Sequence, residues 1–175
     1  MSGPRNLIPF YRGSEANIAR VTLNQILSWN DARLENVHNY IQWLFPQSTP
    51  SQYNPDAPLL DDATIQAFHN DPALQNNLLA SFRRMLAFYG LQMDEGTRVI
   101  TRAPNFNQRS SVWLTPGNHN FWRITRIIDS MKLLGFPGCS RAFLTILQDI
   151  VRIEGVGIVS DETLGHWRRV SPRAL

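Results

Sequence analysis

The sequence predicts an all-α fold, a compact bundle of six or seven helices joined by short connections. Apolar residues recur every three or four positions in most segments, which is the period of an amphipathic helix. Strand-like stretches are confined to residues 98–115, where one small β-hairpin fits the pattern. The chain has 175 residues, 43% of them hydrophobic and 18% charged, so it can build one core and is not a disordered protein. We therefore expect a single helical domain.

The N-terminal part of the chain begins with an irregular segment, residues 1–20, followed by a short helix over 22–28. A longer helix is predicted over 32–45, because a capping Asn-Asp pair precedes it and Pro46 ends it. Its apolar residues have helical spacing and form one face: Leu34, Val37, Ile41, Leu44 and Phe45.

The middle of the chain contains a proline-rich loop and two further helices. Four prolines in residues 46–60 predict an extended loop, which we expect to pack against the body of the domain. An Asp pair caps a helix over 61–70, and Asp71-Pro72 is typical of a helix start. The helix that it starts runs over 72–89 and ends at Gly90.

The least helical part of the chain follows Gly90. Two short strands, 98–102 and 110–115, are predicted to form the hairpin. After a Pro-Gly turn, Asn118 can cap a helix over 118–134. The buried stripe of this helix consists of Ile124, Ile127, Ile128, Met131 and Leu134.

Two helices complete the predicted fold. Ser140 caps a strongly apolar helix over 140–153, and two glycines break the chain after it. A Ser-Asp-Glu sequence at 160–162 begins a last short helix that reaches Trp167.

Composition and missing motifs exclude several classes of protein. A single cysteine, Cys139, excludes an internal disulfide and a cysteine-based zinc site. The four histidines are widely separated, and no phosphate-binding glycine loop or serine-hydrolase elbow occurs. We therefore expect no metal and no cofactor. No uncharged apolar run approaches the roughly 18 residues that span a bilayer, and residues 1–12 contain no secretory signal, so we expect a cytoplasmic protein.

Basic residues are spread unevenly along a chain of net charge +3. No acidic residue occurs between Glu95 and Asp129, whereas five arginines do. This segment is either solvated surface or a face that attracts a carboxylate, a phosphate or an acidic peptide. Nucleic-acid binding through residues 98–126 and the arginine-rich tail is a further hypothesis, but the modest net charge does not favour it.

One polar stripe lies on the predicted helix over 32–45. Glu35, His38 and Gln42 are three and four residues apart, which places them on one helical face beside the apolar one. A partly buried Glu beside a His is a candidate acid/base pair, because the carboxylate fixes the imidazole tautomer. The alternative is a structural network in which these side chains bond to neighbouring segments.

A second polar stripe lies at the start of the predicted helix over 118–134. The free amides of a helix start, with arginines one turn further on, form a candidate anion site. The alternative is an arginine ladder that pairs with acidic residues of the fold. The candidate binding residues of this stripe are Asn118, His119, Asn120, Arg123 and Arg126.

Aromatic residues accompany both stripes. Tyr40 and Trp43 lie in the first helix, and Trp122 lies beside Arg123 in the second. Aromatics at helical spacing usually belong to the core, and the alternative is that they line a pocket.

Five stretches of the sequence resemble the conserved domain of the opioid growth factor receptor family. The most specific are His38–Pro46 (HNYIQWLFP) and Arg123–Ile127 (RITRI). The others are Phe10–Gly13, Pro50–Leu60 and Ser81–Leu91, in the same order and with similar spacing. The resemblance covers residues 8–150, and a C-terminal helix and tail, 155–175, complete one expected domain.

The resemblance implies receptor or interaction functions rather than a reaction. Animal members are described as nuclear-associated receptors for the opioid peptide met-enkephalin and carry long C-terminal regions, so this chain looks like a stand-alone, minimal member. The family supplies no catalytic residues. The positions that match its motifs are His38, Tyr40, Gln42, Trp43, Asn120, Arg123 and Arg126.

These observations lead to two main hypotheses. In the first, the domain binds a small anionic or peptide ligand in a polar pocket between the helices over 31–45 and 118–134. In the second, it is a cofactor-independent enzyme of cyclase or isomerase type in a microbial biosynthetic pathway. There Glu35 and His38 would act as acid and base, and Arg123 and Arg126 would stabilise an anion. The sequence does not indicate an oligomeric state.

Overall fold

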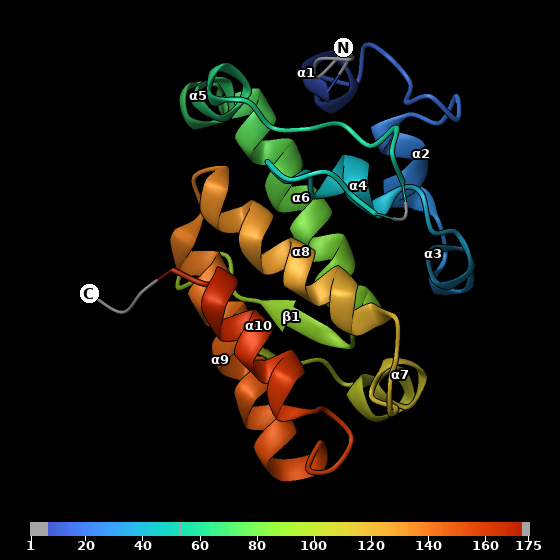
Figure 1. Cartoon of the computed structure of the whole chain (residues 1–175), viewed down its shortest axis with the longest axis vertical. Helices are drawn as coiled ribbons and strands as arrows, with labels where there is room; N and C mark the ends of the chain where they lie inside the picture. The colour runs from blue at the N-terminus through green and yellow to red at the C-terminus, as the bar shows by residue number, and fades with distance from the viewer. Residues whose placement is uncertain (1–6, 53, 173–175) are drawn as a thin grey trace. The chain divides into compact units, whose positions relative to one another are not determined.

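The computed structural model describes residues 7–52 and 54–172 (Figure 1). Within these residues it contains ten helices and one small antiparallel sheet, so the prediction of a mostly helical fold is confirmed. The helices are α1 (Leu7–Tyr11), α2 (Leu23–Ser28), α3 (Asp31–Asn36), α4 (Ile41–Leu44), α5 (Asp62–Asn70), α6 (Pro72–Phe88), α7 (Phe106–Trp113), α8 (Asn120–Leu133), α9 (Pro137–Glu154) and α10 (Asp161–Val170). The strands are β1 (Leu91–Met93) and β2 (Ile100–Arg102).

The prediction of six or seven helices is wrong, for two reasons. The predicted helix over 32–45 is two short helices, α3 and α4, with a break between them. Two further helices, α1 and α7, form in segments that the sequence pattern assigned to an irregular start and to a strand.

The predicted hairpin exists, but with a different partner strand. β2 overlaps the predicted strand over 98–102 and pairs with β1, with Gln92 opposite Thr101. Residues 110–115, predicted as the second strand, belong instead to α7 and the turn after it. The β-propensity of Val112 and Trp113 misled the prediction, because Trp113 is buried from a helix and its indole N–H donates to the Tyr89 carbonyl.

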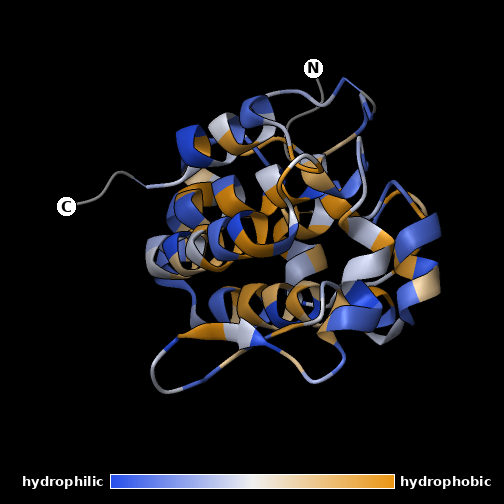
Figure 2. Ribbon diagram, turned by 90° about the horizontal axis from the view of Figure 1, so that it is seen from below, coloured by the Kyte–Doolittle hydropathy of each residue, from blue (hydrophilic) through white to orange (hydrophobic). Residues whose placement is uncertain are grey.

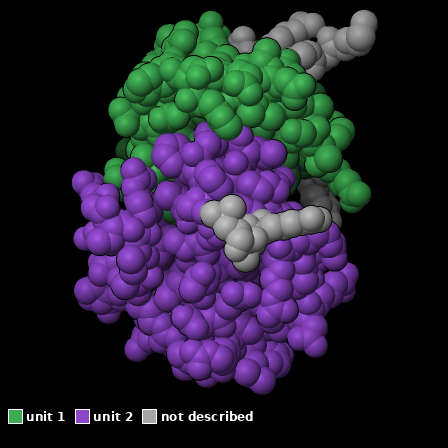
Figure 3. Space-filling model, turned by 90° about the vertical axis from the view of Figure 1, so that its left-hand side faces the viewer, with its two compact units in different colours: residues 1–84 green, residues 85–175 purple. Residues whose placement is uncertain are grey.

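The chain divides into two compact units, residues 1–84 and 85–175, which Figure 3 shows in separate colours. The division falls within α6, and each unit is described by itself. The earlier expectation of one domain over 1–175 stays a prediction.

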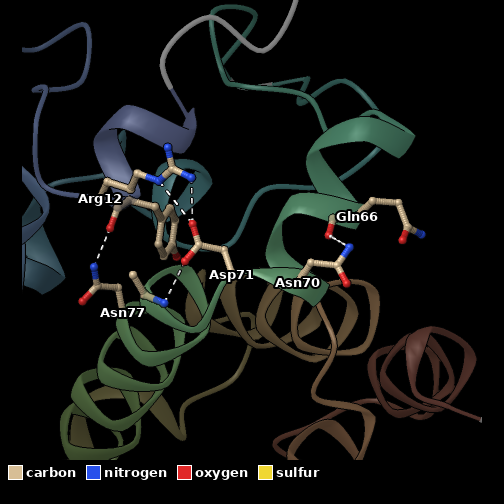
Figure 4. A network of polar contacts seen from close by, with 7 residues as sticks. Arg12, Gln66, Asn70, Asp71 and Asn77 are labelled. Atoms are coloured by element: carbon tan, nitrogen blue, oxygen red, sulfur yellow. Dashed lines mark hydrogen bonds and ion pairs between the residues drawn. The ribbon is translucent and has the colours of Figure 1, made fainter.

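Aromatic rings and polar contacts hold together the first unit. Tyr11 is buried, its ring meets Phe68 edge to face, and its hydroxyl donates to the Leu44 carbonyl. Arg12 binds one carboxylate oxygen of Asp71, while the other oxygen accepts the Ala73 N–H and so caps α6 (Figure 4). The loop over 46–60 packs as expected, with Leu60 buried and its N–H bonded to the Gln47 carbonyl.

Amphipathic helices hold together the second unit. α8, α9 and α10 pack on one another, and each shows one hydrophobic and one hydrophilic face (Figure 2). The whole predicted stripe of α8 is buried. Trp167 of α10 packs edge to face on Phe121 of α8 and donates its indole N–H to the Phe121 carbonyl at 3.1 Å.

Candidate functional site

The first polar stripe of the sequence does not share one helical face. α3 ends at Asn36 and α4 begins at Ile41, so Glu35 lies on α3 and Gln42 on α4, while His38 lies between them and is exposed. The residues responsible for the break are Val37, which leaves helical geometry, and Tyr40. The Tyr40 hydroxyl donates to the Leu34 carbonyl at 3.0 Å. This bond spans the break between the two helices, which the spacing of the apolar residues does not indicate.

The other candidates from this region are buried in the first unit. Tyr40 and Trp43 are 1% and 2% exposed, and Trp43 meets Phe10 edge to face at 5.2 Å. Both therefore stabilise the fold of residues 1–84. Gln42 is also buried, and its side-chain oxygen accepts no hydrogen bond from the described residues. Buried polar atoms of this kind are rare and identify a place where a further polar partner fits.

The second polar stripe forms a chain of hydrogen bonds at the start of α8. The Asn118 side-chain oxygen accepts the backbone N–H of Asn120 at 2.9 Å, so Asn118 performs the predicted capping role two residues before the helix begins. The same oxygen accepts the Asn120 amide at 3.0 Å, and Asn120 in turn accepts from Arg123 at 3.3 Å. This chain fixes the first turn of the helix.

Burial sets the electrostatics of this stripe. Asn120 is fully buried and Arg123 is 5% exposed. Burial lowers the pKa of Arg126 to about 10, while nearby Asp129 acts in the opposite direction, so Arg126 stays charged at neutral pH. His119, Asn120, Arg123 and Arg126 all make additional interactions in the fold, and none of them is without a partner.

Two of the predicted binding residues, Asn118 and Trp122, line a hollow between α8 and α10. Its volume is about 160 Å³. Trp122 is 62% exposed, although it occupies the same helix as the buried Phe121. The hollow is lined by Gly117, Asn118, Phe121, Trp122, Thr125, Glu162, Thr163 and His166.

The side chains that α10 contributes were not predicted from the sequence. The His166 ring lies 5.8 Å from the Trp122 ring. A guanidinium N–H of Arg169 donates to Nδ1 of His166 at 3.1 Å. Nε2, on the other side of the His166 ring, lies 3.7 Å from the Glu162 carboxylate. The signal available in the sequence was the spacing of Glu162 and His166, which places them on one face of a helix. The hollow thus combines an exposed aromatic wall with one carboxylate and one imidazole.

The eleven predicted site residues fall into both units. Glu35, His38, Tyr40, Gln42 and Trp43 belong to residues 1–84, and the other six belong to residues 85–175. The polar pocket that would join the two sets stays a prediction.

Comparison with known families assigns this sequence to a family. The model of one family, the opioid growth factor receptor (OGFr) conserved region, matches residues 6–167. The chain belongs to this family. The resemblance inferred from the sequence motifs is thereby confirmed, and the match extends from α1 into α10.

Individual relatives cover a shorter stretch. The opioid growth factor receptors of Mus musculus and Homo sapiens are 39% and 38% identical over 111 residues, which is 62% of this chain. The opioid growth factor receptor-like protein 1 of Xenopus tropicalis is 33% identical over 119 residues, or 66% of this chain. The aligned parts are 17%, 16% and 23% of those proteins, so the chain spans less than a quarter of the relatives it matches.

Two further findings are negative. No solved structure matches the fold. Among the described residues, no helix combines the length and the apolarity needed to cross a membrane.

Proposed function

We propose that this chain is an interaction domain that binds a peptide segment at the hollow between α8 and α10. The observation that carries the proposal is Trp122, a large aromatic side chain that stays 62% exposed beside a hollow. Tryptophan is enriched among the residues that dominate binding energy at protein interfaces. The names of the relatives, which describe receptors, favour the same class of function.

The size of the hollow favours a peptide over a whole metabolite. Pockets that enclose drug-sized ligands measure roughly 300–1,000 Å³, whereas this hollow measures about 160 Å³. It can accept one apolar side chain between Trp122 and Phe121, while the rest of a peptide lies over the surface. Glu162 and His166 at its wall supply polar groups for the peptide backbone or for a charged neighbour.

The finer predictions from the sequence remain proposals of the same kind. An anionic or peptide ligand in a pocket between the helices over 31–45 and 118–134 would use Arg123 and Arg126. The enzymatic alternative would use Glu35 and His38, and the break between α3 and α4 removes the shared helical face on which that pair was based. No observation favours the enzymatic alternative over binding.

Tryptophan fluorescence provides a direct test. The other four tryptophans, at positions 29, 43, 113 and 167, are all at most 9% exposed, so acrylamide quenches chiefly Trp122. Peptides are selected on the full chain from a random heptapeptide display library, and opioid growth factor, the peptide in the relatives' names, is added as a defined probe. A bound peptide is expected to shield Trp122 and to lower the quenching constant.

Two variants make this test specific. Trp122→Ala is expected to abolish both the quenchable component and peptide binding. Val156→Ala removes apolar surface from another residue that is 77% exposed and does not line the hollow, and it is expected to bind as the parent chain does. Selected peptides that shield Trp122 in the parent chain and yet bind Trp122→Ala as tightly would refute the proposal.

A further inference from the structure

A second and larger groove lies within residues 85–175, between the hairpin turn and α9. Its volume is about 680 Å³. Its lining residues on α9 recur every three or four positions from Gly138 to Asp149, which is one face of the helix. The remaining lining comes from residues 97–100 of the hairpin, from Gly135 and Phe136 before α9, and from Pro137 at its first position.

The floor of this groove is apolar. Ile100 is buried beneath it, and Phe136, Ala142 and Ile146 line it with partly exposed surface. Val99, at the rim, is 54% exposed. Apolar surface framed by polar residues is one feature of surfaces that bind another chain.

A single cation, Arg98, stands over the apolar floor. Its guanidinium lies 3.9 Å from the Cys139 sulfur and 5.9 Å from the Phe136 ring centroid. A thiol is a weak acceptor, and Arg98 forms no ion pair with a carboxylate of the described residues. The one acidic lining residue, Asp149, is paired with Arg152 at 3.0 Å. The groove therefore presents positive charge that the fold does not neutralise.

The backbone holds Arg98 in this place at an energetic cost. Its φ is +61°, in the left-handed region that side chains other than glycine rarely adopt. The turn is fixed by Asp94, whose carbonyl accepts the Arg98 N–H at 2.9 Å and whose carboxylate accepts the Thr97 N–H at 2.7 Å. The position of the guanidinium is thus set by the turn rather than by a charged partner.

The outer side of β2 at Ile100 is mostly buried, because this residue is only 6% exposed. The Asp94 N–H bonds to the Val99 carbonyl, so alternation along the ladder directs the N–H and C=O of Ile100 away from β1. The α9 face that lines the groove, from 138 to 149, is about 17 Å long at 1.5 Å per residue. An extended segment of about five residues has the same length.

We infer that this groove docks an extended, acidic and apolar segment of a partner protein. The segment places apolar side chains against Phe136 and Ile146 and sets a carboxylate against Arg98. This surface is separate from the hollow at Trp122, so the inference does not depend on the peptide proposed there.

Charge reversal at Arg98 tests the inference. A random heptapeptide display library is selected on the full chain carrying Trp122→Ala, which removes selection at the hollow. Parallel selections use the same chain with Arg98→Glu, and with Arg168→Glu as a matched control. Arg168→Glu makes the same change of net charge on an exposed residue of α10 that does not line the groove.

The expected result is a preference that follows the charge of residue 98. Peptides from the parent and from Arg168→Glu should combine Asp or Glu with Val, Ile or Leu. Each should lose affinity about tenfold or more on Arg98→Glu, which should select basic peptides instead.

Other outcomes would overturn the inference. Peptides with no charge preference, or with a preference that is unchanged by Arg98→Glu, would show that Arg98 does not bind a carboxylate of the segment. Ala142→Glu fills the groove, adds a negative charge to it and serves as the second variant if Arg98→Glu fails to fold. Acidic peptides that bind Ala142→Glu with unchanged affinity would exclude the groove. Dimerisation in sedimentation velocity that Ala142→Glu abolishes would assign the groove to a second copy of this chain.

Discussion

The helices of residues 1–84 and those of residues 85–175 are stabilised in different ways. No helix that lies wholly within the first unit exceeds nine residues, whereas α8 and α9 have 14 and 18. Short helices are marginal alone, so α2, α3 and α5 each begin at a residue whose side chain accepts a backbone N–H. In the second unit Asn118 and Ser160 accept backbone N–H groups at the starts of α8 and α10, but the long helices α8 and α9 depend mainly on a buried apolar face.

The two units also differ in charge. Residues 1–84 contain six basic and seven acidic side chains, and residues 85–175 contain eleven basic and seven acidic ones. The hollow at Trp122 and the groove at Arg98 both belong to the basic unit. Both proposed binding surfaces therefore belong to the unit with the larger excess of basic side chains.

The largest effect should come from removing a buried ring of the second unit. Trp167→Ala deletes a side chain that is 0% exposed, with its contact to Phe121 and its indole hydrogen bond. We expect a loss of about 3–5 kcal/mol in the free energy of unfolding, measured by urea denaturation.

Hydrogen exchange then shows whether the two units are independent. If they unfold separately, Trp167→Ala should accelerate backbone amide exchange within residues 85–175 and leave α2 and α3 protected. Equal acceleration in both units would instead show a single cooperative fold.

A smaller effect should come from the turn that follows α6. Gly90 has a φ of +76°, and a Cβ built there would lie 2.8 Å from the Phe106 Cα and the Arg109 Cβ. Gly90→Ala should therefore cost about 2–4 kcal/mol, from backbone strain and overpacking together. Gly117→Ala is the matched control, because Gly117 also has a positive φ but meets nothing within 4 Å. Equal melting temperatures for the two variants would mean that the clash is relieved at no cost.

The second unit was also the easier one to predict from the sequence. The stripe of α8 keeps its period over four turns, and Gly90 ended α6 as predicted because its backbone needs a positive φ. The break between α3 and α4 contains neither glycine nor proline and depends on the contact of Tyr40 with Leu34, which lies outside the reach of local rules. The start of α9 was placed three residues late because Ser140 outweighed Pro137 as a signal.

The candidate site was predictable only on the α8 side. Asn118 and Trp122 were named because they adjoin a helix start, but Glu162 and His166 reach the hollow only through the packing of α10 on α8. The larger groove was still harder to predict from the sequence. It forms because Arg98, in a turn, lies against α9, and the residues in contact are about forty positions apart in the sequence. Pairings of this kind follow from tertiary structure and not from periodicity.

In the first unit, the test of intermediate size concerns Tyr11. Tyr11→Phe keeps the ring but removes the hydroxyl that donates to the Leu44 carbonyl, and we expect a loss of about 1–3 kcal/mol in the free energy of unfolding, measured by thermal or urea denaturation.

Burial raises the pKa of Tyr11 well above its usual range, so the folded state holds this proton more tightly than the unfolded state. The resulting stability is complete below the unfolded pKa of about 10 and is lost as the pH rises beyond it. Tyr11→Phe should therefore weaken the alkaline dependence of unfolding, and an unchanged dependence would contradict the assignment.

The smallest effect should come from a cap of the first unit, and only its pH dependence should change. Asp61 accepts the Thr64 N–H at 2.8 Å, and hydrogen bonds from Thr64 hold the pKa of this carboxyl below its ordinary value. A depressed pKa means that the charged form stabilises the fold above the unfolded pKa of about 4, and that this contribution is lost as the pH falls below it. Asn caps a helix as well as Asp but does not titrate. Asp61→Asn should therefore leave the free energy of unfolding at pH 7 nearly unchanged and should weaken its decrease at acid pH.

Asp61→Ala, which removes the cap itself, should lose about 1 kcal/mol in the free energy of unfolding at pH 7. If Asp61→Asn were as damaging as Asp61→Ala at neutral pH, the charge and not the hydrogen bond would hold the start of α5. The helices of residues 1–84 would then depend on electrostatics that the longer helices of residues 85–175 do without.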